Sequence, residues 1–358
     1  MISRVRSHGA PRGATLALLI AAVAIGASRA AGDSTAQTLR QNGFAMELPL
    51  GLQADAAYVP EDNPITAAKV ELGRLLYFDP RLSIDKTISC ASCHIPYHGF
   101  ADPARTSAGV GRKLGGRNSP TVINRIFSKE QFWDGRAADL EDQAHGPLVN
   151  PVEMAMPKHD KVVEQCNSVA GYAPFFEKAF GSAEITMPRI AQAIASYERT
   201  VVAGNSPFDR HMAGDKDAMS ASAVRGMEIF NGKGNCKTCH AGFNFTDEQY
   251  HNLGIGVGAA KPDLGRFEIT KIETDKGAFK TPTLRNVSEN PPYMHDGSEP
   301  TLKAVVELYN RGGVKNPWLS KEMKALKLSP GEIDDVVAFL YALTGEVHGL
   351  EPPRELPR

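Results

Sequence analysis

Four of the five cysteines in this sequence form two closely spaced pairs, and a histidine follows each pair directly. The two segments are Cys90-Ala-Ser-Cys93-His94 and Cys236-Lys-Thr-Cys239-His240. In a C-x-x-C-H segment, the two thiols attach one haem covalently and the histidine becomes an axial ligand of its iron. A redox dithiol, half a zinc site or a disulfide are the alternatives for C-x-x-C alone. Two complete copies predict two covalently bound haem c groups.

Helices are expected to position the two motifs. Apolar residues recur with helical spacing at 70–78, before the first motif, and at 224–230, before the second. Thr186 and Pro188 begin another amphipathic stretch, and Ser329 with Glu332 form a capping box before a last one. Runs with the period of a strand are few. The predicted fold is therefore mainly α with long loops, in two cytochrome-c-like domains that each carry one haem.

The N-terminal 30 residues look like a secretory signal. They contain four arginines and no acid, and an uncharged run spans residues 14–27. A membrane anchor is the alternative, but this run is shorter than the roughly 20 residues that span a bilayer. We therefore expect a signal peptide at 1–30, an N-terminal haem domain at 31–204 and a C-terminal haem domain at 205–358. The mature chain should be periplasmic, with no membrane span.

Charge excludes one class of partner. Removing the four leader arginines from the 40 basic residues leaves 36, against 41 acidic residues. A mildly acidic body argues against a nucleic-acid binder.

Several longer motifs accompany the haem motifs in a fixed order. They are Leu72-Gly-Arg-Leu-Leu-Tyr-Phe-Asp-Pro80, Arg117-Asn-Ser-Pro-Thr121, Gln131-Phe-Trp-Asp-Gly-Arg136, Asn150-Pro-Val-Glu-Met154, Thr283-Leu-Arg-Asn286 and Pro292-Tyr-Met-His-Asp-Gly297. With them, the chain resembles the bacterial di-haem cytochrome c peroxidase and MauG family over nearly all of its mature length. The resemblance implies that one haem reacts with hydrogen peroxide while the other relays or stores electrons.

Two positions separate the subclasses of this family. Where its ordinary peroxidases carry a loop histidine that ligates the N-terminal haem, this chain has Val110, so that haem should be open to peroxide. Where they carry a methionine ligand on the C-terminal haem, this chain has Tyr309, as MauG does. A phenolate ligand donates charge and favours high oxidation states of iron. A plain core aromatic is the alternative for Tyr309, and Met294 and His295 are rival ligands by chemistry.

The resemblance also assigns residues around the irons. Glu153 matches the acid–base group of the peroxide site, Gln143 and Pro147 match its other distal residues, and Trp133 matches the tryptophan between the haems. Arg136 and Arg285 are expected partners of haem propionates. A calcium ion is implied at the side chain of Asn118 and the backbone carbonyls of Asn290 and Pro292.

The leading interpretation is an exported MauG-like enzyme that uses hydrogen peroxide to oxidise a side chain of a partner protein, through a high-valent state of both haems. One alternative is a cytochrome c peroxidase that takes electrons from a small cytochrome or copper protein. The other is a non-catalytic di-haem electron carrier. Cys166 is expected to be a buried inert thiol, and Trp318 is either a relay of electrons or a packing residue.

Overall fold

Helices joined by long loops make up most of the chain, which confirms the predicted fold class. The computed structural model describes residues 36–358, so the expected signal peptide lies outside the described residues. The helices in this part are α1 (Ala67–Tyr77), α2 (Cys90–Cys93), α3 (Leu140–Val149), α4 (His159–Asn167), α5 (Ala173–Phe180), α6 (Met187–Glu198), α7 (Pro207–Met212), α8 (Ala221–Asn231), α9 (Phe267–Thr270), α10 (Leu302–Asn310) and α11 (Pro330–Tyr341). Among the described residues, no helix is both long enough and apolar enough to cross a membrane.

The strands are short and pair only in antiparallel couples within the described residues. They are β1 (Gln37–Gln41) with β2 (Phe44–Leu48), β3 (Ala203–Gly204) with β6 (Glu346–Val347), and β4 (Tyr250–Asn252) with β5 (Ala278–Lys280). None of these ribbons could form an apolar core alone. The two larger cores are therefore helical, and a small third core packs Leu39 and Leu48 of the first ribbon with Ile65 and Val202.

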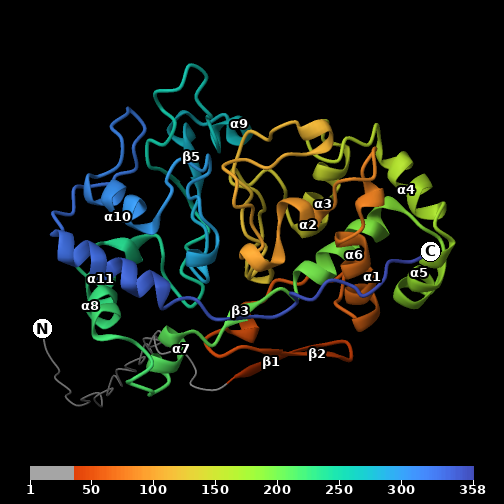
Figure 1. The fold of residues 1–358 in the computed structure, drawn as a ribbon, viewed down its shortest axis with the longest axis horizontal. Helices are drawn as coiled ribbons and strands as arrows, with labels where there is room; N and C mark the ends of the chain where they lie inside the picture. Colours follow the sequence, from red (N-terminus) through yellow and green to blue (C-terminus); the bar gives the residue numbers. More distant parts are fainter. Residues whose placement is uncertain (1–35) are drawn as a thin grey trace, which may run out of the picture. The chain divides into compact units, whose positions relative to one another are not determined.

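The first helical group pairs α1 with α6, and α3 packs against α6 (Figure 1). The side chain of Thr186 caps α6 by accepting a hydrogen bond from the amide of Arg189, as the sequence predicts. Gly73 makes the α1–α6 crossing possible, because a Cβ atom there would lie 1.8 Å from the carbonyl oxygen of Ala193. The apolar stripes of both helices meet in one core that includes Leu76, Tyr77 and Tyr197.

The second group repeats this arrangement with α8 and α11 (Figure 1). Here a Cβ atom at Gly226 of α8 would lie 1.9 Å from the carbonyl oxygen of Asp335 of α11. The predicted capping box of Ser329 and Glu332 begins α11. The same close crossing, formed twice by helices far apart in the sequence, agrees with two cytochrome-c-like domains.

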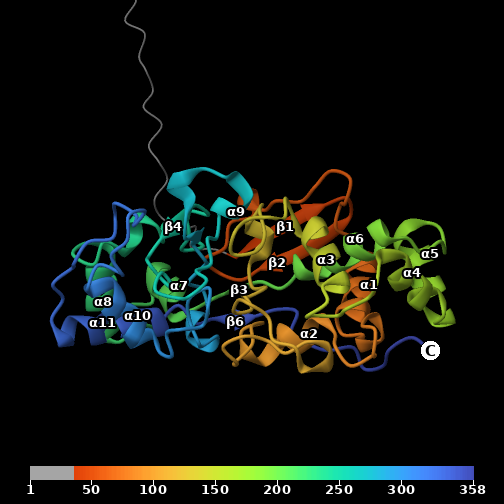
Figure 2. The same cartoon turned by 90° about the horizontal axis from the view of Figure 1, so that it is seen from above.

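The C-terminal tail returns to the first helical group. After β6 pairs with β3, the tail runs to α4 and α5, where the amide of Gly171 donates a 2.7 Å hydrogen bond to the carbonyl oxygen of Arg358 (Figure 2). Arg81 donates to the carbonyl oxygen of Pro357, and Leu350 and Leu356 pack against the first core. Residues 346–358 thus complete the core that contains α1 and α6.

Candidate haem sites and active site

The first cavity, of about 360 Å³, is lined by Cys90, Cys93 and His94. We call it the N-terminal cavity. The Nδ1 atom of His94 lies 3.0 Å from the carbonyl oxygen of Pro120, so Nδ1 carries a proton and Nε2 is free to bind iron. Burial lowers the pKa of His94, which keeps the imidazole neutral as a metal ligand must be.

The second cavity, of about 200 Å³, is lined by Cys236, Cys239, His240 and Tyr309. We call it the C-terminal cavity. The Nδ1 atom of His240 lies 2.9 Å from the carbonyl oxygen of Phe245, and burial lowers the pKa of this histidine as well. Two thiols and a neutral histidine therefore meet in each cavity. This donor set fits haem c.

None of the five cysteines, all of which lie in the described part, forms a disulfide. Burial raises the pKa of every one, to about 12 for Cys236 and to about 11 for Cys239. Cys166 is fully buried in the first core and lines neither cavity, with a pKa raised to about 12. It has the surroundings of an inert packing residue.

Three residues expected on the distal side line the N-terminal cavity together. Gln143 and Pro147 project from α3, and Glu153 follows that helix. Burial raises the pKa of Glu153 although the charge of Arg136 and a 2.8 Å hydrogen bond from the Asn150 side chain oppose the rise. A carboxyl group whose pKa is raised toward the pH at which it works can both take up and return a proton.

The loop that carries Val110 is fixed against the Glu153 segment. The amide of Val110 donates a 2.8 Å hydrogen bond to the carbonyl oxygen of Glu153. Gly109 lines the cavity, whereas the Val110 side chain does not. A Cβ atom at Gly109 would lie 2.2 Å from the carbonyl oxygen of Val152, so a larger residue there would push the two segments apart.

One wall is common to both cavities. Trp133, Asn118, Arg125 and Lys280 each line both of them. Burial lowers the pKa of Lys280 to about 7, although the carboxylate of Glu248 lies 3.2 Å away. The side chains of Arg125 and Lys280 in this wall are suited to pair with haem propionates. The negative charge of a propionate would favour the charged form of Lys280.

The three residues expected to bind calcium all line the C-terminal cavity. The side-chain nitrogen of Asn118 faces the carbonyl oxygens of Ala104 and Arg105, each at 3.3 Å. Its amide oxygen, and the carbonyl oxygens of Asn290 and Pro292, receive no hydrogen bond among the described residues. Free oxygen atoms of this kind are the ligands that Ca²⁺ prefers.

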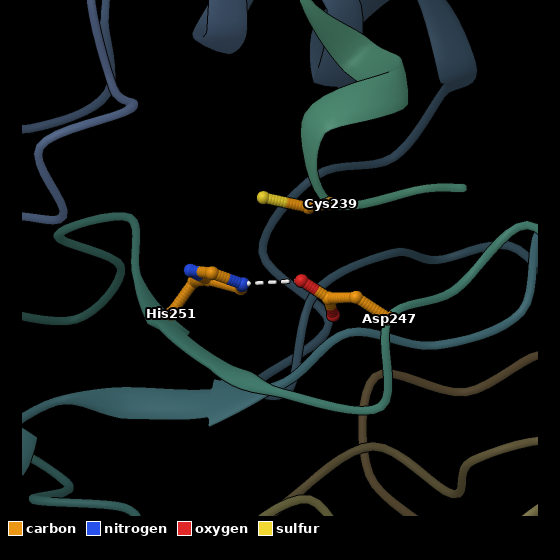
Figure 3. A group of neighbouring side chains, drawn as sticks. All are labelled: Cys239, Asp247 and His251. Atoms are coloured by element: carbon orange, nitrogen blue, oxygen red, sulfur yellow. Dashed lines mark hydrogen bonds and ion pairs between the residues drawn. The ribbon is translucent and has the colours of Figure 1, made fainter. Parts of the chain in front are cut away.

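Cys239, Asp247 and His251 form a small cluster at the C-terminal cavity (Figure 3). Nε2 of His251 lies 2.9 Å from a carboxylate oxygen of Asp247. Burial alone would raise the pKa of Asp247, but this contact and other hydrogen bonds outweigh burial and lower it. Because the Cys239 thiol is the expected haem attachment atom, His251 is a polar residue of the cavity wall, and Asp247 holds its ring in place.

The structure corrects one expectation about the arginines. Arg136 lines the N-terminal cavity, but Arg285 lines neither. The Arg285 guanidinium instead forms two hydrogen bonds, of 2.8 and 3.0 Å, to the carboxylate of Asp209, and both side chains are about 1% exposed. Because the Arg285 guanidinium is buried and paired with Asp209, it is not available to bind a haem propionate.

Sequence reasoning missed Arg125, Lys280 and Glu198. Glu198, at the end of α6, lines the N-terminal cavity and is 6% exposed, and its carboxyl group forms no hydrogen bond among the described residues. Burial raises its pKa to about 8. An internal repeat could have indicated the shared wall, since Pro120-Thr-Val-Ile-Asn124 beside His94 recurs as Pro282-Thr-Leu-Arg-Asn286 in the second half.

The rival ligands and the second tryptophan have other surroundings. Met294 and His295 line the C-terminal cavity with Tyr309, and the His295 ring stacks on Phe279 with 3.5 Å between ring centroids. Trp318 lines neither cavity. Its Nε1 donates a 3.0 Å hydrogen bond to Glu273.

Two such cavities with a common wall define a di-haem enzyme built from cytochrome c domains. The chain belongs to the di-haem cytochrome c peroxidase family: that family's sequence model matches residues 67–217, and the cytochrome c model matches residues 223–344. It is therefore an oxidoreductase, and its family carries haem c.

Individual relatives fall in both subclasses. The chain is 41% identical to the methylamine utilization protein MauG of Methylorubrum extorquens over 92% of each chain. It is 40% identical to the cytochrome c551 peroxidase of Nitrosomonas europaea over 82% of this chain and 84% of that one. Among solved structures, a MauG-like protein associated with microbial copper homeostasis superposes with a TM-score of 0.76 at 31% identity, covering 83% of this chain and 95% of that chain.

Proposed function

We propose that this protein is a periplasmic enzyme that uses hydrogen peroxide to oxidise a side chain of a partner protein. The observation that carries the proposal is the position of Tyr309, which faces the same cavity as His240. When bound, the haem irons supply the redox chemistry, with peroxide reacting in the N-terminal cavity and an oxidising equivalent held in the C-terminal one. Residues 31–204 and 205–358 would be the two corresponding domains.

Glu153 would move the protons of peroxide. Its carboxyl group takes a proton from the incoming peroxide and returns it to the departing oxygen, while Gln143 and Pro147 shape the space beside it. The Val110 side chain offers no ligand and lies outside the cavity lining, which supports an iron that is open to peroxide at rest.

His240 and Tyr309 would together hold the haem iron in the C-terminal cavity. Removal from water and the nearby thiols raise the pKa of the Tyr309 phenol, so it keeps its proton until a metal ion stabilises the phenolate. A phenolate lowers the potential of a haem relative to a thioether ligand. Storing an oxidising equivalent is then favoured over simple relay of electrons.

A second candidate function is the removal of peroxide with electrons from a small cytochrome or copper protein. The 40% identity to a cytochrome c551 peroxidase favours it. Trp133 serves either function, because a tryptophan in the common wall can pass electrons in both directions. A non-catalytic electron carrier is disfavoured, since it would need neither Glu153 nor Gln143 beside an open iron.

Resting ferric holoenzyme and its Tyr309→Phe variant test the proposal by electron paramagnetic resonance. We expect one high-spin and one low-spin haem, with the low-spin signal altered in the variant. Two low-spin haems at rest would contradict the open N-terminal site. Mixing with peroxide should give an oxidised state that persists without a donor, whereas fast turnover of reduced cytochrome c without such a state would establish the second function.

Glu153→Gln tests the acid–base role separately. We expect the reaction with peroxide to slow by roughly 100-fold, as for loss of a general acid–base group. Glu164→Gln on the exposed face of α4 is the matched control and should leave the rate unchanged. An unchanged rate in Glu153→Gln would remove that residue from the mechanism.

A further inference from the structure

The loop at residues 311–327 separates the C-terminal cavity from solvent. It connects α10, which ends at Asn310 directly after Tyr309, to α11. On its inner side, the loop lines the cavity with Ser320, Glu322, Met323 and Leu326. A partner that contacts the outer side of the loop is therefore separated from the proposed haem only by the loop itself.

The outer side of this loop is strongly basic. Its 17 residues contain five basic side chains, all exposed, and a single acid, Glu322, so their formal charge is 5 − 1 = +4. The five are Arg311, Lys315, Lys321, Lys324 and Lys327. The body of the chain outside the leader has the opposite sign, with 36 basic against 41 acidic residues.

None of these five cations has an ion pair or side-chain hydrogen bond within residues 36–358. Other exposed lysines on the surrounding elements do, such as Lys233 with Glu332, Lys303 with Asp334, and Lys271 with Glu268. Like charges grouped on one short loop repel each other and do not stabilise the fold. An anionic surface on another molecule would offset the repulsion between these cations.

The loop has an exposed side and a side that lines the cavity. Lys321, Lys324 and Lys327 are exposed, while Met323 and Leu326, which lie between them, are half-buried and line the cavity. Trp318 is held half-buried in the same loop, with Nε1 bonded to Glu273 and the Lys276 Nζ atom 4.8 Å from its ring centroid. The loop thus carries both the exposed cations and an anchored aromatic side chain.

We propose that the 311–327 loop is the docking surface for a partner protein with an acidic face, and that electrons cross this loop to the C-terminal haem. The proposal rests on the proposed function only in assuming a protein partner. Electrostatic complementarity accelerates association by about 10- to 1,000-fold at low ionic strength. The loop would therefore select partners by charge.

Cytochrome c and its succinylated form provide matched probes, because succinylation replaces lysine cations with carboxylates on the same fold. We expect the holoenzyme to bind the succinylated form at least about tenfold more tightly in low salt. The preference should fade between 0.01 M and 0.15 M salt, where the Debye length falls from about 30 to 8 Å. Surface plasmon resonance without peroxide measures this binding even if the proposed peroxide reaction fails.

A charge-reversed variant, Lys321→Glu with Lys324→Glu, should lose the preference by tenfold or more at low salt, in line with loss of steering. The control, Lys86→Glu with Lys178→Glu, makes the same change of net charge at exposed lysines outside the loop and should retain the preference. Equal binding of both probes, or an equal loss in the control, would overturn the proposal. So would tighter binding to phosphatidylglycerol vesicles than to the acidic probe, if the loop variant abolished it, since the loop would then bind lipid.

Discussion

The indole Nε1 of Trp133 donates a 2.9 Å hydrogen bond to the carbonyl oxygen of Asn118. The amide of Asn118 in turn donates a 2.8 Å bond to the carbonyl oxygen of His295. Asn118 lies in the wall that the two cavities share, and both of its backbone polar groups are bonded: its carbonyl oxygen to Trp133 and its amide to His295. These two hydrogen bonds fix the indole of Trp133 in the wall between the two proposed haems.

Replacing Trp133 tests this wall. Trp133→Phe removes the hydrogen bond at a net cost of about 1 kcal/mol of stability, and we expect electron exchange between the haems to slow. Flash photolysis of the half-reduced holoenzyme measures the exchange. Trp318→Phe, in the outer loop, is the control, and equal exchange rates in wild type and Trp133→Phe would exclude the indole as the route.

The positive charge of Arg136 opposes the raised pKa of Glu153. In Arg136→Gln that pKa should rise further, so less of the basic carboxylate form exists at a given low pH. The acid limb of the rate profile for reaction with peroxide should therefore move to higher pH. Stopped-flow rates across the pH range measure the limb, and Arg189→Gln on α6 should leave it in place. A limb that stays or moves to lower pH in Arg136→Gln would contradict the role of Glu153.

Glu198 should make the holoprotein less stable as pH rises. Its pKa is raised by burial to about 8, whereas the unfolded chain has the ordinary value of 4.5. Between these values the folded state retains a proton that the unfolded state releases, so the free energy of unfolding falls with increasing pH. Glu198→Gln should lose this decline. Denaturation curves at several pH values measure it, and parallel pH dependences would show that Glu198 is already paired once haem is present.

The buried pair of Arg285 and Asp209 should be essential to stability. Arg285→Met leaves the Asp209 carboxylate buried with only its contacts to Ser206, and such a loss costs about 3–5 kcal/mol. Guanidinium denaturation of the holoprotein measures the difference. Lys303→Met breaks an exposed pair with Asp334 and should cost far less stability, because water and salt screen such pairs. Similar costs for both variants would show that the buried guanidinium is replaceable.

Calcium should stabilise the holoprotein through Asn118. At free Ca²⁺ of 100 times the dissociation constant, the gain is roughly 3 kcal/mol. Chelation should lower the melting temperature, and Ca²⁺ but not Mg²⁺ should restore it, because Mg²⁺ demands a smaller octahedral shell. Asn118→Ala should abolish the response. A response that persists in the variant would place the ion elsewhere.

Local sequence patterns predicted the parts of the site that depend on neighbouring residues. The two haem motifs, the caps at Thr186 and Ser329, and the helices that precede each motif are all encoded within a few residues. Family resemblance added Tyr309 and Glu153, which the structure places in the expected cavities.

Other features depend on tertiary contacts that no local pattern records. Lys280 and Glu198 are ordinary charged residues in sequence, and only the folding of distant segments buries them beside a cavity. The error at Arg285 has the same origin, since its partner Asp209 lies 76 positions away.

The return of the tail to the first helical group has a consequence for the order of assembly. Domains generally form in the order in which they are synthesised, but the amide of Gly171 finds its acceptor only once Arg358 has been made. The first helical group therefore gains this hydrogen bond and the packing of Leu350 and Leu356 only after the second group has been synthesised.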